Sequence, residues 1–319
     1  MTSGHPISFE RFMQQALHDP RRGYYARRIN GVGRRGDFTT GPMMSDVPAR
    51  AVAAWAAKAL RETGCRDMIE IGPGEGTLAA AVRGFLPWHV RWKTRLHLVE
   101  TSVPLAERQR NVLGQRASWH LDVSSVLKAC GGRAVIFSNE LVDAFPVRRF
   151  QKTDEGWREL AVRFDEDRRV HESLLAPAPL PDSSGFLESH PTGQMIEVHD
   201  AYRHYLRSWL PAWTAGRMLT IDYGASAEDL YHRRPRGTVR AYLHHQRLEG
   251  PAIYENPGMQ DLTADVNFTD LQNWSSSWVG MQRLVTLGGF LASFTGARKD
   301  PLLDPQGAGG AFLVLEQSK

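Results

Sequence analysis

The sequence predicts an α/β fold in which a doubly wound, mostly parallel sheet is covered by helices. Three observations support this prediction. From residue 67 onward, short apolar runs of strand length alternate with segments of helical spacing. A glycine-rich segment follows the first of these runs directly, and acidic residues stand at the ends of the first, second and third runs. Parallel strands that are buried on both faces read as such short apolar runs, and helices connect them.

The composition is that of a folded globular protein. The chain has 319 residues, of which 42% are hydrophobic and 23% charged, which excludes an intrinsically disordered chain. Cys65 and Cys130 are too few for a disulfide framework and lack the spacing of a zinc site, so we expect reduced thiols. The N-terminus does not resemble a signal peptide, and no apolar run is long enough to span a bilayer. We therefore expect a cytoplasmic location without membrane insertion.

The charge pattern does not favour a nucleic-acid partner. The formal net charge is +4, and the arginines gather in local groups such as residues 233–236. Solvated loops account for such groups more often than an acidic or nucleic-acid partner does. We expect no nucleic acid to bind.

The first sixty residues are expected to form a helical extension or lid. Apolar side chains at helical spacing predict a helix over residues 6–17, which Asp19 and Pro20 end. A loop rich in glycine and arginine follows, and an alanine-rich helix is expected over residues 47–60. We therefore predict an extension over residues 1–60 and a main domain over residues 61–319.

The main domain begins with a βαβ alternation, whose crossovers are expected to be right-handed. Further on, alternating apolar residues predict an antiparallel insertion at about residues 148–199, followed by a helix over 200–213 and a strand over 218–224. Two apolar runs near the C-terminus, 288–294 and 311–315, are expected to be the final antiparallel strands. The first four predicted strands span residues 68–71, 96–100, 118–122 and 134–138, and the helices between them span 77–85 and 105–113.

The glycine segment after the first strand is a candidate ligand site. Gly72, Gly74 and Gly76 lie where a strand passes into a helix, so backbone N–H groups and the positive end of the helix dipole are available to a ligand. The spacing is not G-x-G-x-x-G, because position 77 is threonine, and this disfavours a dinucleotide. Glu70 precedes the segment and favours a cationic, amino-acid-bearing ligand over a pyrophosphate.

Acidic residues also end the second and third predicted strands. Glu100 is placed to accept from both ribose hydroxyls of an adenosine, and Asp122 from its adenine amino group. One such acid alone is better explained as the cap of the following helix. Three acids at successive strand ends favour a nucleoside-binding edge instead.

The fourth strand is followed by Asn139 and Glu140, which form a candidate catalytic pair. Ligands of open α/β sheets bind at the carboxyl ends of the strands, so Glu140 is expected to face the reacting end of the cofactor. A carboxylate there can hold a guanidinium by paired hydrogen bonds. A helix cap or a loop salt bridge is an equally good interpretation of the spacing. Asp222 is expected in a structural turn, and His244 with its neighbour lacks a third metal ligand, so no metal is expected.

These segments together resemble the MidA family of S-adenosylmethionine-dependent methyltransferases, which are relatives of the mitochondrial complex I assembly factor that methylates an arginine. The resemblance covers nearly the whole chain, and its specificity lies in the order and spacing of the blocks. The blocks are residues 7–9, 19–25, 36–40, 70–78, 98–102, 139–146, 219–224, 237–242 and 257–264.

The resemblance implies a class I methyltransferase fold of the Rossmann-like type, with S-adenosyl-L-methionine as the cofactor. It places Asp37 and Phe38 beside the cofactor and implies a catalytic role for Glu140, by similarity to the glutamate loop of type II protein arginine methyltransferases. The chain departs from the family pattern at residues 41–46, at Asp265 and at Asn267. The resemblance implies contacts to the cofactor from Gly72, Gly74, Gly76 and Glu100, and Glu70, Thr101 and Asp122 complete the set of candidate cofactor-binding residues.

Four functions follow from these observations. The first is methylation of a protein arginine, with a subunit of a respiratory complex as one candidate substrate. The second is methylation of another acceptor, and the third is a non-catalytic, cofactor-binding assembly factor. The fourth, an NAD oxidoreductase, is disfavoured by the glycine spacing. Fold alone does not separate the four, because one sheet architecture carries many chemistries.

Overall fold

The computed structural model describes residues 5–27, 45–167, 169–244, 246–296 and 299–319, and these form two compact units. Unit 1 is drawn from residues 1–29, 142–205 and 224–273 of the chain, and unit 2 from 30–141, 206–223 and 274–319. The helix predicted over 47–60 thus belongs to unit 2, whereas the first helix clusters with the insertion. The units therefore follow different boundaries from the predicted extension over 1–60 and domain over 61–319.

The sheet of unit 2 confirms the predicted doubly wound, mostly parallel fold. Its strand order is β15-β16-β10-β5-β2-β3-β4, whereas the last two residues of β10, Gly224 and Ala225, belong to unit 1 and pair there with β14. Strands β4, β3, β2, β5 and β10 are parallel to their neighbours, whereas β16 is antiparallel to β10 and β15. The bounds are β2 Asp67–Ile71, β3 Arg95–Val99, β4 Ser118–His120, β5 Val135–Asn139, β10 Arg217–Ala225, β14 Val266–Asn267, β15 Met281–Thr286 and β16 Phe312–Ser318.

The strand order reverses at β2 and β5, and this places a ligand crevice. From β2 the chain proceeds to β3 and β4 on one side, and from β5 to β10 on the other. In open α/β sheets, ligands bind outside the carboxyl ends of the strands at such a switch point. The segments that follow β2, β3, β4 and β5 are therefore the ones to inspect.

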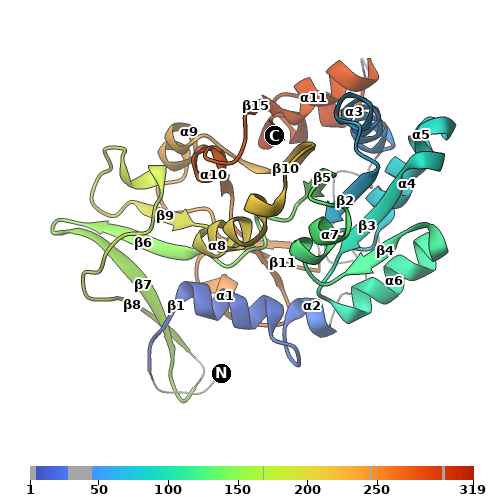
Figure 1. Cartoon of the computed structure of the whole chain (residues 1–319). Coiled ribbons are helices and arrows are strands. Elements are labelled where there is room, and N and C mark those ends of the chain that lie inside the picture. Colours follow the sequence, from blue (N-terminus) through green and yellow to red (C-terminus); the bar gives the residue numbers. More distant parts are fainter. Residues whose placement is uncertain (1–4, 28–44, 168, 245, 297–298) are drawn as a thin grey trace. The chain divides into compact units, whose positions relative to one another are not determined.

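Helices cover both faces of this sheet. Figure 1 shows α3 and α4 on one side of β2 and β3, with α7 on the other. Helix α3 contacts both α4 and α11, and together they bury the main apolar core of unit 2. The helices of unit 2 are α3 Val47–Thr63, α4 Thr77–Phe85, α5 Trp88–Lys93, α6 Val103–Leu113, α7 Val123–Ala129, α11 Leu287–Thr295 and α12 Ala308–Ala311, with short 3-10 turns at Gly114–Arg116, Leu210–Ala212 and Pro301–Leu303.

The predicted strand over residues 288–294 is wrong, because this segment is helix α11. Thr286 caps the helix, its side chain accepting from the N–H of Gly289 (3.2 Å), and Gly296 ends it in a left-handed conformation. Leu287, Phe290 and Leu291 are buried on one face, at the spacing of a helix. The run over 311–315 does form the expected antiparallel strand, β16, but its edge partner is β15, which the apolar pattern did not indicate.

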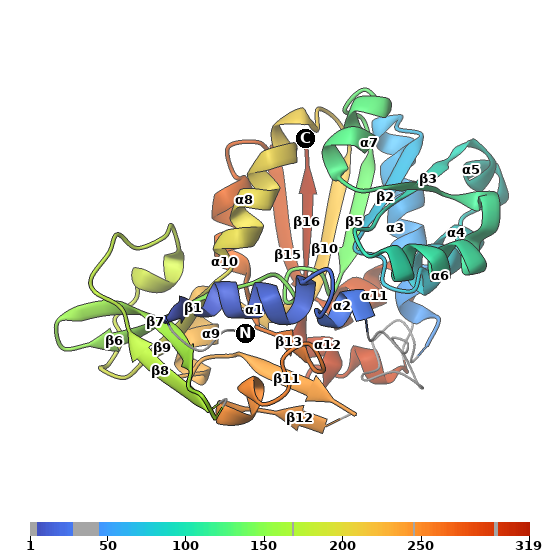
Figure 2. The same ribbon diagram turned by 90° about the horizontal axis from the view of Figure 1, so that it is seen from below.

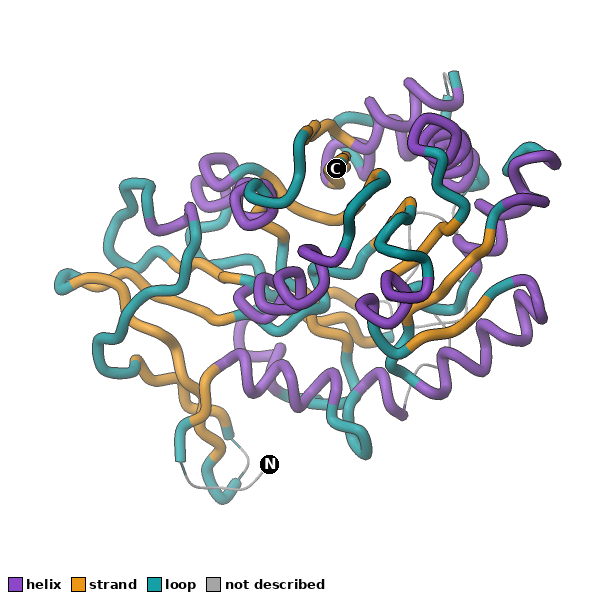
Figure 3. Tube along the Cα trace, viewed as in Figure 1, coloured by secondary structure: helices purple, strands orange, loops and turns teal. Residues whose placement is uncertain are grey.

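Unit 1 contains two antiparallel sheets, which include the predicted insertion. Figure 3 shows their strands in orange, with β6 and β7 as a long hairpin. The five-stranded sheet has the order β1-β7-β6-β9, with β8 paired to β7, and the three-stranded sheet has the order β12-β11-β13. The bounds are β1 Ile7–Ser8, β6 Arg148–Thr153, β7 Gly156–Phe164, β8 Val170–Leu174, β9 Met195–Val198, β11 Arg240–Leu243, β12 Gln246–Leu248 and β13 Asp261–Thr263.

A second apolar core holds unit 1 together. Helix α1 (Phe9–His18) begins after the cap Ser8 and buries Phe9, Phe12 and Met13 against residues of both sheets. Figure 2 shows α1 beside β11 and β13. The other helices of unit 1 are α2 Tyr24–Arg27 and α9 Ala227–Arg233, with 3-10 turns η3 Ser184–Phe186 and η5 Gly250–Tyr254; α8 Asp200–Trp209 and α10 Phe268–Ser275 contain residues of both units.

No helix in the described part of the chain has both the length and the apolar character needed to cross a bilayer.

Candidate functional site

The glycine segment forms a tight loop between β2 and α4. Gly72, Gly74 and Gly76 all have positive φ (64°, 54° and 79°), a conformation that side chains with a Cβ rarely adopt. The N–H of Gly72 donates to the carbonyl of Val99 (3.1 Å), which ties the loop to β3. A Cβ at Gly72 would lie 2.6 Å from Leu141 Cδ1, whereas a Cβ at Gly74 would meet nothing within 4 Å. The loop is packed at Gly72 and open at Gly74, where a ligand can reach the backbone.

Glu70 is a buried carboxylate with an unsatisfied oxygen. Its side chain is 2% exposed, and its Oε2 accepts no hydrogen bond from any described residue. Burial raises the pKa of Glu70 to about 8, and a hydrogen bond from the backbone of Ala79 only partly opposes this. An orphaned buried acceptor is costly, at roughly 1–3 kcal/mol, so the site is suited to a ligand that brings a cationic donor.

Glu100 follows β3 and is held by the start of the next helix and by Gln109. Its Oε1 accepts from the N–H of Ser102 (2.7 Å), and its Oε2 accepts from Gln109 Nε2 (3.1 Å). Burial raises the pKa of Glu100, and these hydrogen bonds oppose the rise. The carboxylate is fixed at the edge of the sheet, as a ribose acceptor has to be.

Gln109 is a site residue that the sequence analysis missed. It is fully buried on α6, and its Nε2 donates both to Glu100 and to the carbonyl of Gly74 (2.7 Å). Its Oε1 accepts from Trp119 Nε1 (3.0 Å), so one side chain links the glycine loop, β3 and β4. A glutamine on the buried face of an amphipathic helix is the signal that would have revealed it, because buried polar groups need partners.

Asp122 follows β4 and caps a helix. Its Oδ1 accepts from the N–H of Ser125 (2.7 Å) at the start of α7, which is the alternative role considered for such acids. Strand β4 ends at His120, two residues earlier than expected. Asp122 and Thr101 are both exposed at this edge of the sheet, and their contacts to a cofactor stay predictions.

Asn139 and Glu140 lie together at the carboxyl end of β5. The side-chain amide of Asn139 donates to Glu140 Oε1 (2.9 Å) and orients the carboxylate. Glu140 has φ of +51°, which is uncommon for any residue other than glycine. Strain of this kind costs on the order of 1–3 kcal/mol and gathers at functional sites. The strained backbone is held in place, because the N–H of Glu140 donates to the carbonyl of Ile221 (2.9 Å).

Asp222 holds the same loop from the neighbouring strand, β10. It is fully buried, its Oδ2 accepts from the N–H of Leu141 (3.1 Å) and its Oδ1 from the N–H of Tyr223 (2.9 Å). These contacts agree with the structural role that was expected for Asp222, and they give it a second role. By fixing Leu141, Asp222 also fixes the residue before it, Glu140.

Several predicted positions lie elsewhere. Asp37, Phe38 and residues 41–44 fall outside the described residues. The family departures Asp265 and Asn267 are parts of unit 1, where Asp265 pairs with Arg240 and Asn267 Nδ2 donates to Ser184 Oγ (3.0 Å). Among the described residues, no group of three His, Cys, Asp or Glu side chains is arranged to hold a metal ion.

A comparison with protein families decides the class of enzyme. A family model described as "Putative S-adenosyl-L-methionine-dependent methyltransferase" matches residues 51–286, which is most of the chain. The chain belongs to this methyltransferase family. The match includes every described candidate residue, from the glycine loop to Asp222.

Individual relatives agree with this assignment. The chain is 30% identical over 309 residues to the human protein arginine methyltransferase NDUFAF7, mitochondrial, spanning 86% of this chain and 66% of the relative's length. Its identity to the mouse protein of the same name is 29% over 97% of this chain and 76% of the relative. A Burkholderia thailandensis structure bound to S-adenosyl-homocysteine superposes with a TM-score of 0.85 at 26% identity, covering 98% of this chain and 88% of that one.

The protein is therefore an S-adenosyl-L-methionine-dependent methyltransferase. The residues described above fit this cofactor. The cofactor carries an amino-acid end, with an ammonium and a carboxylate group, and an adenosine, and the two are joined at a sulfonium. The orphaned Oε2 of Glu70 suits the ammonium group, and the space at Gly74 admits the ligand to the backbone. The fixed carboxylate of Glu100 suits the ribose hydroxyls.

Proposed function

We propose that this methyltransferase transfers a methyl group to the guanidino group of an arginine in a protein. The observation that carries the proposal is Glu140, a carboxylate on a strained and doubly anchored backbone at the carboxyl end of β5. A carboxylate can pair with two guanidinium nitrogens at once, which fixes the plane of the acceptor. The names of the human and mouse relatives support the same acceptor class.

The chain's residues act in this reaction by binding and alignment. The cofactor supplies an already activated methyl group on its sulfonium, so the protein has to position the acceptor more than activate the donor. In the proposed reaction the guanidinium is held by Glu140, whose orientation is set by Asn139 and whose backbone is set by Asp222 through Leu141. The carboxylate of Glu140 would accept the proton that the guanidinium gives up on receiving the methyl group, and the cofactor would leave as S-adenosylhomocysteine, with the electrons of the broken bond on its sulfur.

The acceptor can be identified by labelling. The pure protein is incubated with methyl-labelled S-adenosyl-L-methionine and a lysate of its host from which the gene has been deleted, and the labelled product is hydrolysed. The proposal expects label in a protein band and as methylarginine. Label in another amino acid or in a small molecule would favour the second function, methylation of another acceptor. No label in any fraction would favour the non-catalytic assembly factor.

Glu140→Gln tests the residue-level claim. The amide keeps the shape but loses the charge, and a charge-assisted hydrogen bond contributes roughly 1.5–3 kcal/mol, so transfer to the identified substrate should fall at least about tenfold. S-adenosylhomocysteine affinity, measured by calorimetric titration on the same preparation, should stay within about twofold, since this carboxylate is assigned to the acceptor. Glu107→Gln, an equal change at an exposed position of α6, serves as the control.

Two outcomes would contradict this assignment. Transfer at the wild-type rate would make Glu140 a structural residue. Loss of cofactor affinity together with transfer would place Glu140 in the cofactor site and favour a different acceptor. The expected cytoplasmic location and the candidate substrate in a respiratory complex remain proposals of the sequence analysis.

A further inference from the structure

Unit 1 contains a cleft of about 760 Å³, and none of the cofactor-site residues line it. Pockets of about 300–1,000 Å³ are of the size that binds ligands. One wall is a face of the five-stranded sheet, to which β6 contributes Arg149 and Gln151 and β8 contributes Val170 and Glu172. Residues two apart on a strand share a face, which is why these side chains line the cleft together. The rest of the lining comes mainly from residues 234–239 and 247–254.

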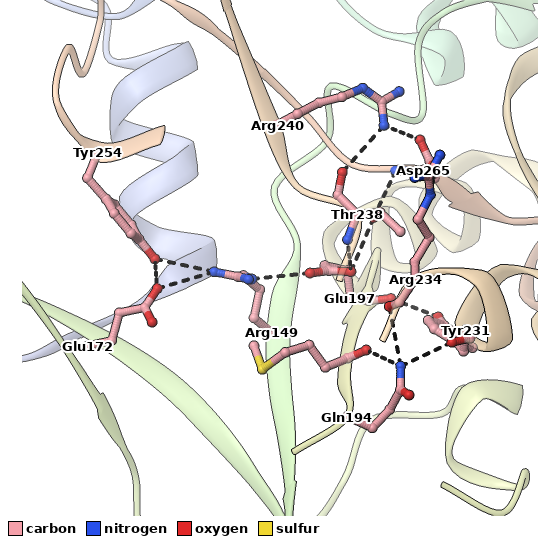
Figure 4. A network of polar contacts seen from close by, with 11 residues as sticks. Arg149, Glu172, Gln194, Glu197, Tyr231, Arg234, Thr238, Arg240, Tyr254 and Asp265 are labelled. Carbon is pink, nitrogen blue, oxygen red and sulfur yellow. Dashed lines mark hydrogen bonds and ion pairs between the residues drawn. The ribbon is translucent and has the colours of Figure 1, made fainter. Parts of the chain in front are cut away.

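The floor of the cleft is a satisfied ionic network. Figure 4 shows Arg149 between Glu197 on one side and Glu172 with Tyr254 on the other. Arg149 is 8% exposed, and its Nε donates to Glu197 Oε1 (3.2 Å) while its Nη1 donates to Tyr254 OH (3.3 Å) and to Glu172 Oε1 (3.4 Å). The other oxygen of Glu197 accepts from Thr238. A buried polar network whose members are all paired is rigid, so it holds the side chains that line the cleft in fixed positions.

A tight turn in the wall carries two further arginines. The N–H of Gly237 donates to the carbonyl of Arg234 (2.9 Å), and Pro235 occupies the position that proline favours in such turns. The turn is anchored to the sheet, because Met195 N donates to the carbonyl of Pro235 (2.9 Å). The backbone that carries Arg234 and Arg236 is already ordered, so it loses little conformational entropy when a ligand binds.

The cleft has a surplus of positive charge. Its lining holds four arginines and two glutamates, and Glu197 beneath the lining also pairs with Arg149, so the uncompensated positive charge belongs to Arg234 and Arg236. Each glutamate is already paired, Glu172 with Arg149 and Glu249 with Arg247. Arg234 faces Asp265 at 3.9 Å, but Arg236 is exposed and has no ion-pair partner among the described residues. The ligand that complements this lining is an anion.

The other lining residues indicate which kind of anion. Carboxylates stand beside the arginines, and they would repel a compact, multiply charged phosphate. Apolar side chains also line the cleft, including Val170, Met195 and Ile253. Spaced carboxylates that alternate with apolar groups fit this mixture better. That is the pattern of an acidic polypeptide segment.

The structure also divides the basic cluster of residues 233–236. Arg234 and Arg236 line the cleft, whereas Arg233 lies on α9, is exposed and pairs with Asp229 (3.3 Å). We propose that the cleft binds an acidic segment of the protein substrate, at a distance in sequence from the arginine that is methylated. This inference rests on the proposed function, in that it assumes a protein acceptor. The cleft would select the protein, and the cofactor-bearing unit would methylate it.

A binding experiment tests the cleft without methyl transfer. The probe is a fluorescent, end-capped peptide of alternating glutamate and alanine, titrated by anisotropy against the full chain, with the glutamine version as the reference peptide. The glutamate peptide should bind, and Arg236→Glu should weaken it at least about tenfold because an attractive charge becomes repulsive. The matched control Arg233→Glu makes the same charge change on the neighbouring exposed arginine and should change the affinity less than about twofold.

Turnover supplies a second readout. With the labelled host protein as substrate, Arg236→Glu should raise KM at unchanged kcat, because it removes binding that is made equally before and during transfer. Its melting temperature and its affinity for S-adenosylhomocysteine should match the wild type. Absence of peptide binding, or equal weakening by Arg233→Glu, would overturn the inference. So would binding of ATP or inorganic phosphate in place of the glutamate peptide.

The two proposals fail separately. If the label is found on a small molecule, the arginine assignment fails, whether or not the peptide binds. If the label is found on a protein arginine while the peptide does not bind or does not depend on Arg236, only the cleft assignment fails.

Discussion

Glu70 and Glu197 are glutamates of equal burial, each 2% exposed, but they belong to different units and have opposite surroundings. Glu197 accepts from Arg149 and twice from Thr238, so its charge is paired within unit 1. Glu70 has an oxygen without a partner among the described residues, and its pKa is raised to about 8. A buried carboxylate is kept either because it stabilises the fold or because a ligand uses it. The hydrogen-bond inventory separates these two cases.

The largest effect is expected at the open part of the glycine loop. Gly74→Val should bring S-adenosylhomocysteine binding below detection by calorimetry, because the branched side chain fills the space where the ligand meets the backbone and disfavours φ of +54°. Gly131→Val is the matched control, since Gly131 also has positive φ and open space around its Cβ but lies between α7 and β5. Equal loss of binding in the control would mean that backbone strain alone is responsible.

The paired glutamate should matter to stability. Glu197→Ala leaves Arg149 with a reduced set of partners, and breaking a buried ion pair costs about 3–5 kcal/mol. Glu172→Ala removes a carboxylate that is 46% exposed and should cost about 1 kcal/mol or less. Urea unfolding of the three proteins measures both differences. A similar cost for the two variants would show that Glu197 is not the main partner of Arg149.

A smaller effect is expected at the turn that faces Glu197. A Cβ at Gly237 would lie 2.2 Å from Glu197 Oε1, and the residue has φ of +84°. Gly237→Ala should therefore destabilise unit 1 by about 2–3 kcal/mol, compared with about 1 kcal/mol for Gly250→Ala, where φ is +60° and nothing lies within 4 Å. Thermal unfolding of both variants separates the cost of the contact with Glu197, which only Gly237→Ala makes, from the cost of positive φ, which both variants share. Equal costs would mean that Glu197 moves aside without loss.

The smallest expected effect is a pH dependence that belongs to Glu70. Its folded pKa of about 8 lies above the unfolded value of 4.5, so the folded state binds the extra proton between these limits and stability falls as pH rises through them. The stability difference between wild type and Glu70→Gln should shift by up to about 1.4 kcal/mol per pH unit within this window. Denaturant titrations without cofactor at pH 6 and 7 provide the test. A constant difference would mean that Glu70 keeps an ordinary pKa.

The parts of the site that are local in sequence could be predicted. Helix α4 over Thr77–Phe85, the glycine loop and the acids at successive strand ends follow from apolar runs and turn residues within a few positions of one another. The positive φ of Glu140 could not, because it depends on Ile221 and Asp222 of another strand.

The network beneath the cleft was equally inaccessible to sequence reasoning. Arg149 meets Glu197 and Tyr254 across separations of 48 and 105 residues. Alternating apolar residues indicate an antiparallel insertion. They do not indicate which acidic residue of a neighbouring strand will pair with a given arginine. The segment of helix α11 was expected to be a strand because a short, mostly apolar run has no readable period. Its cap Thr286 and terminal Gly296 were the better signals.

The most direct test of the account is a calorimetric titration of S-adenosylhomocysteine into wild type and Glu70→Gln at neutral pH. If the unpaired Oε2 of Glu70 is kept for the ammonium group of the cofactor, that cation should stabilise the ionised carboxylate on binding, and the variant should bind about tenfold more weakly while remaining folded, because this charge-assisted hydrogen bond is lost. Unchanged affinity in a folded Glu70→Gln protein would contradict the account.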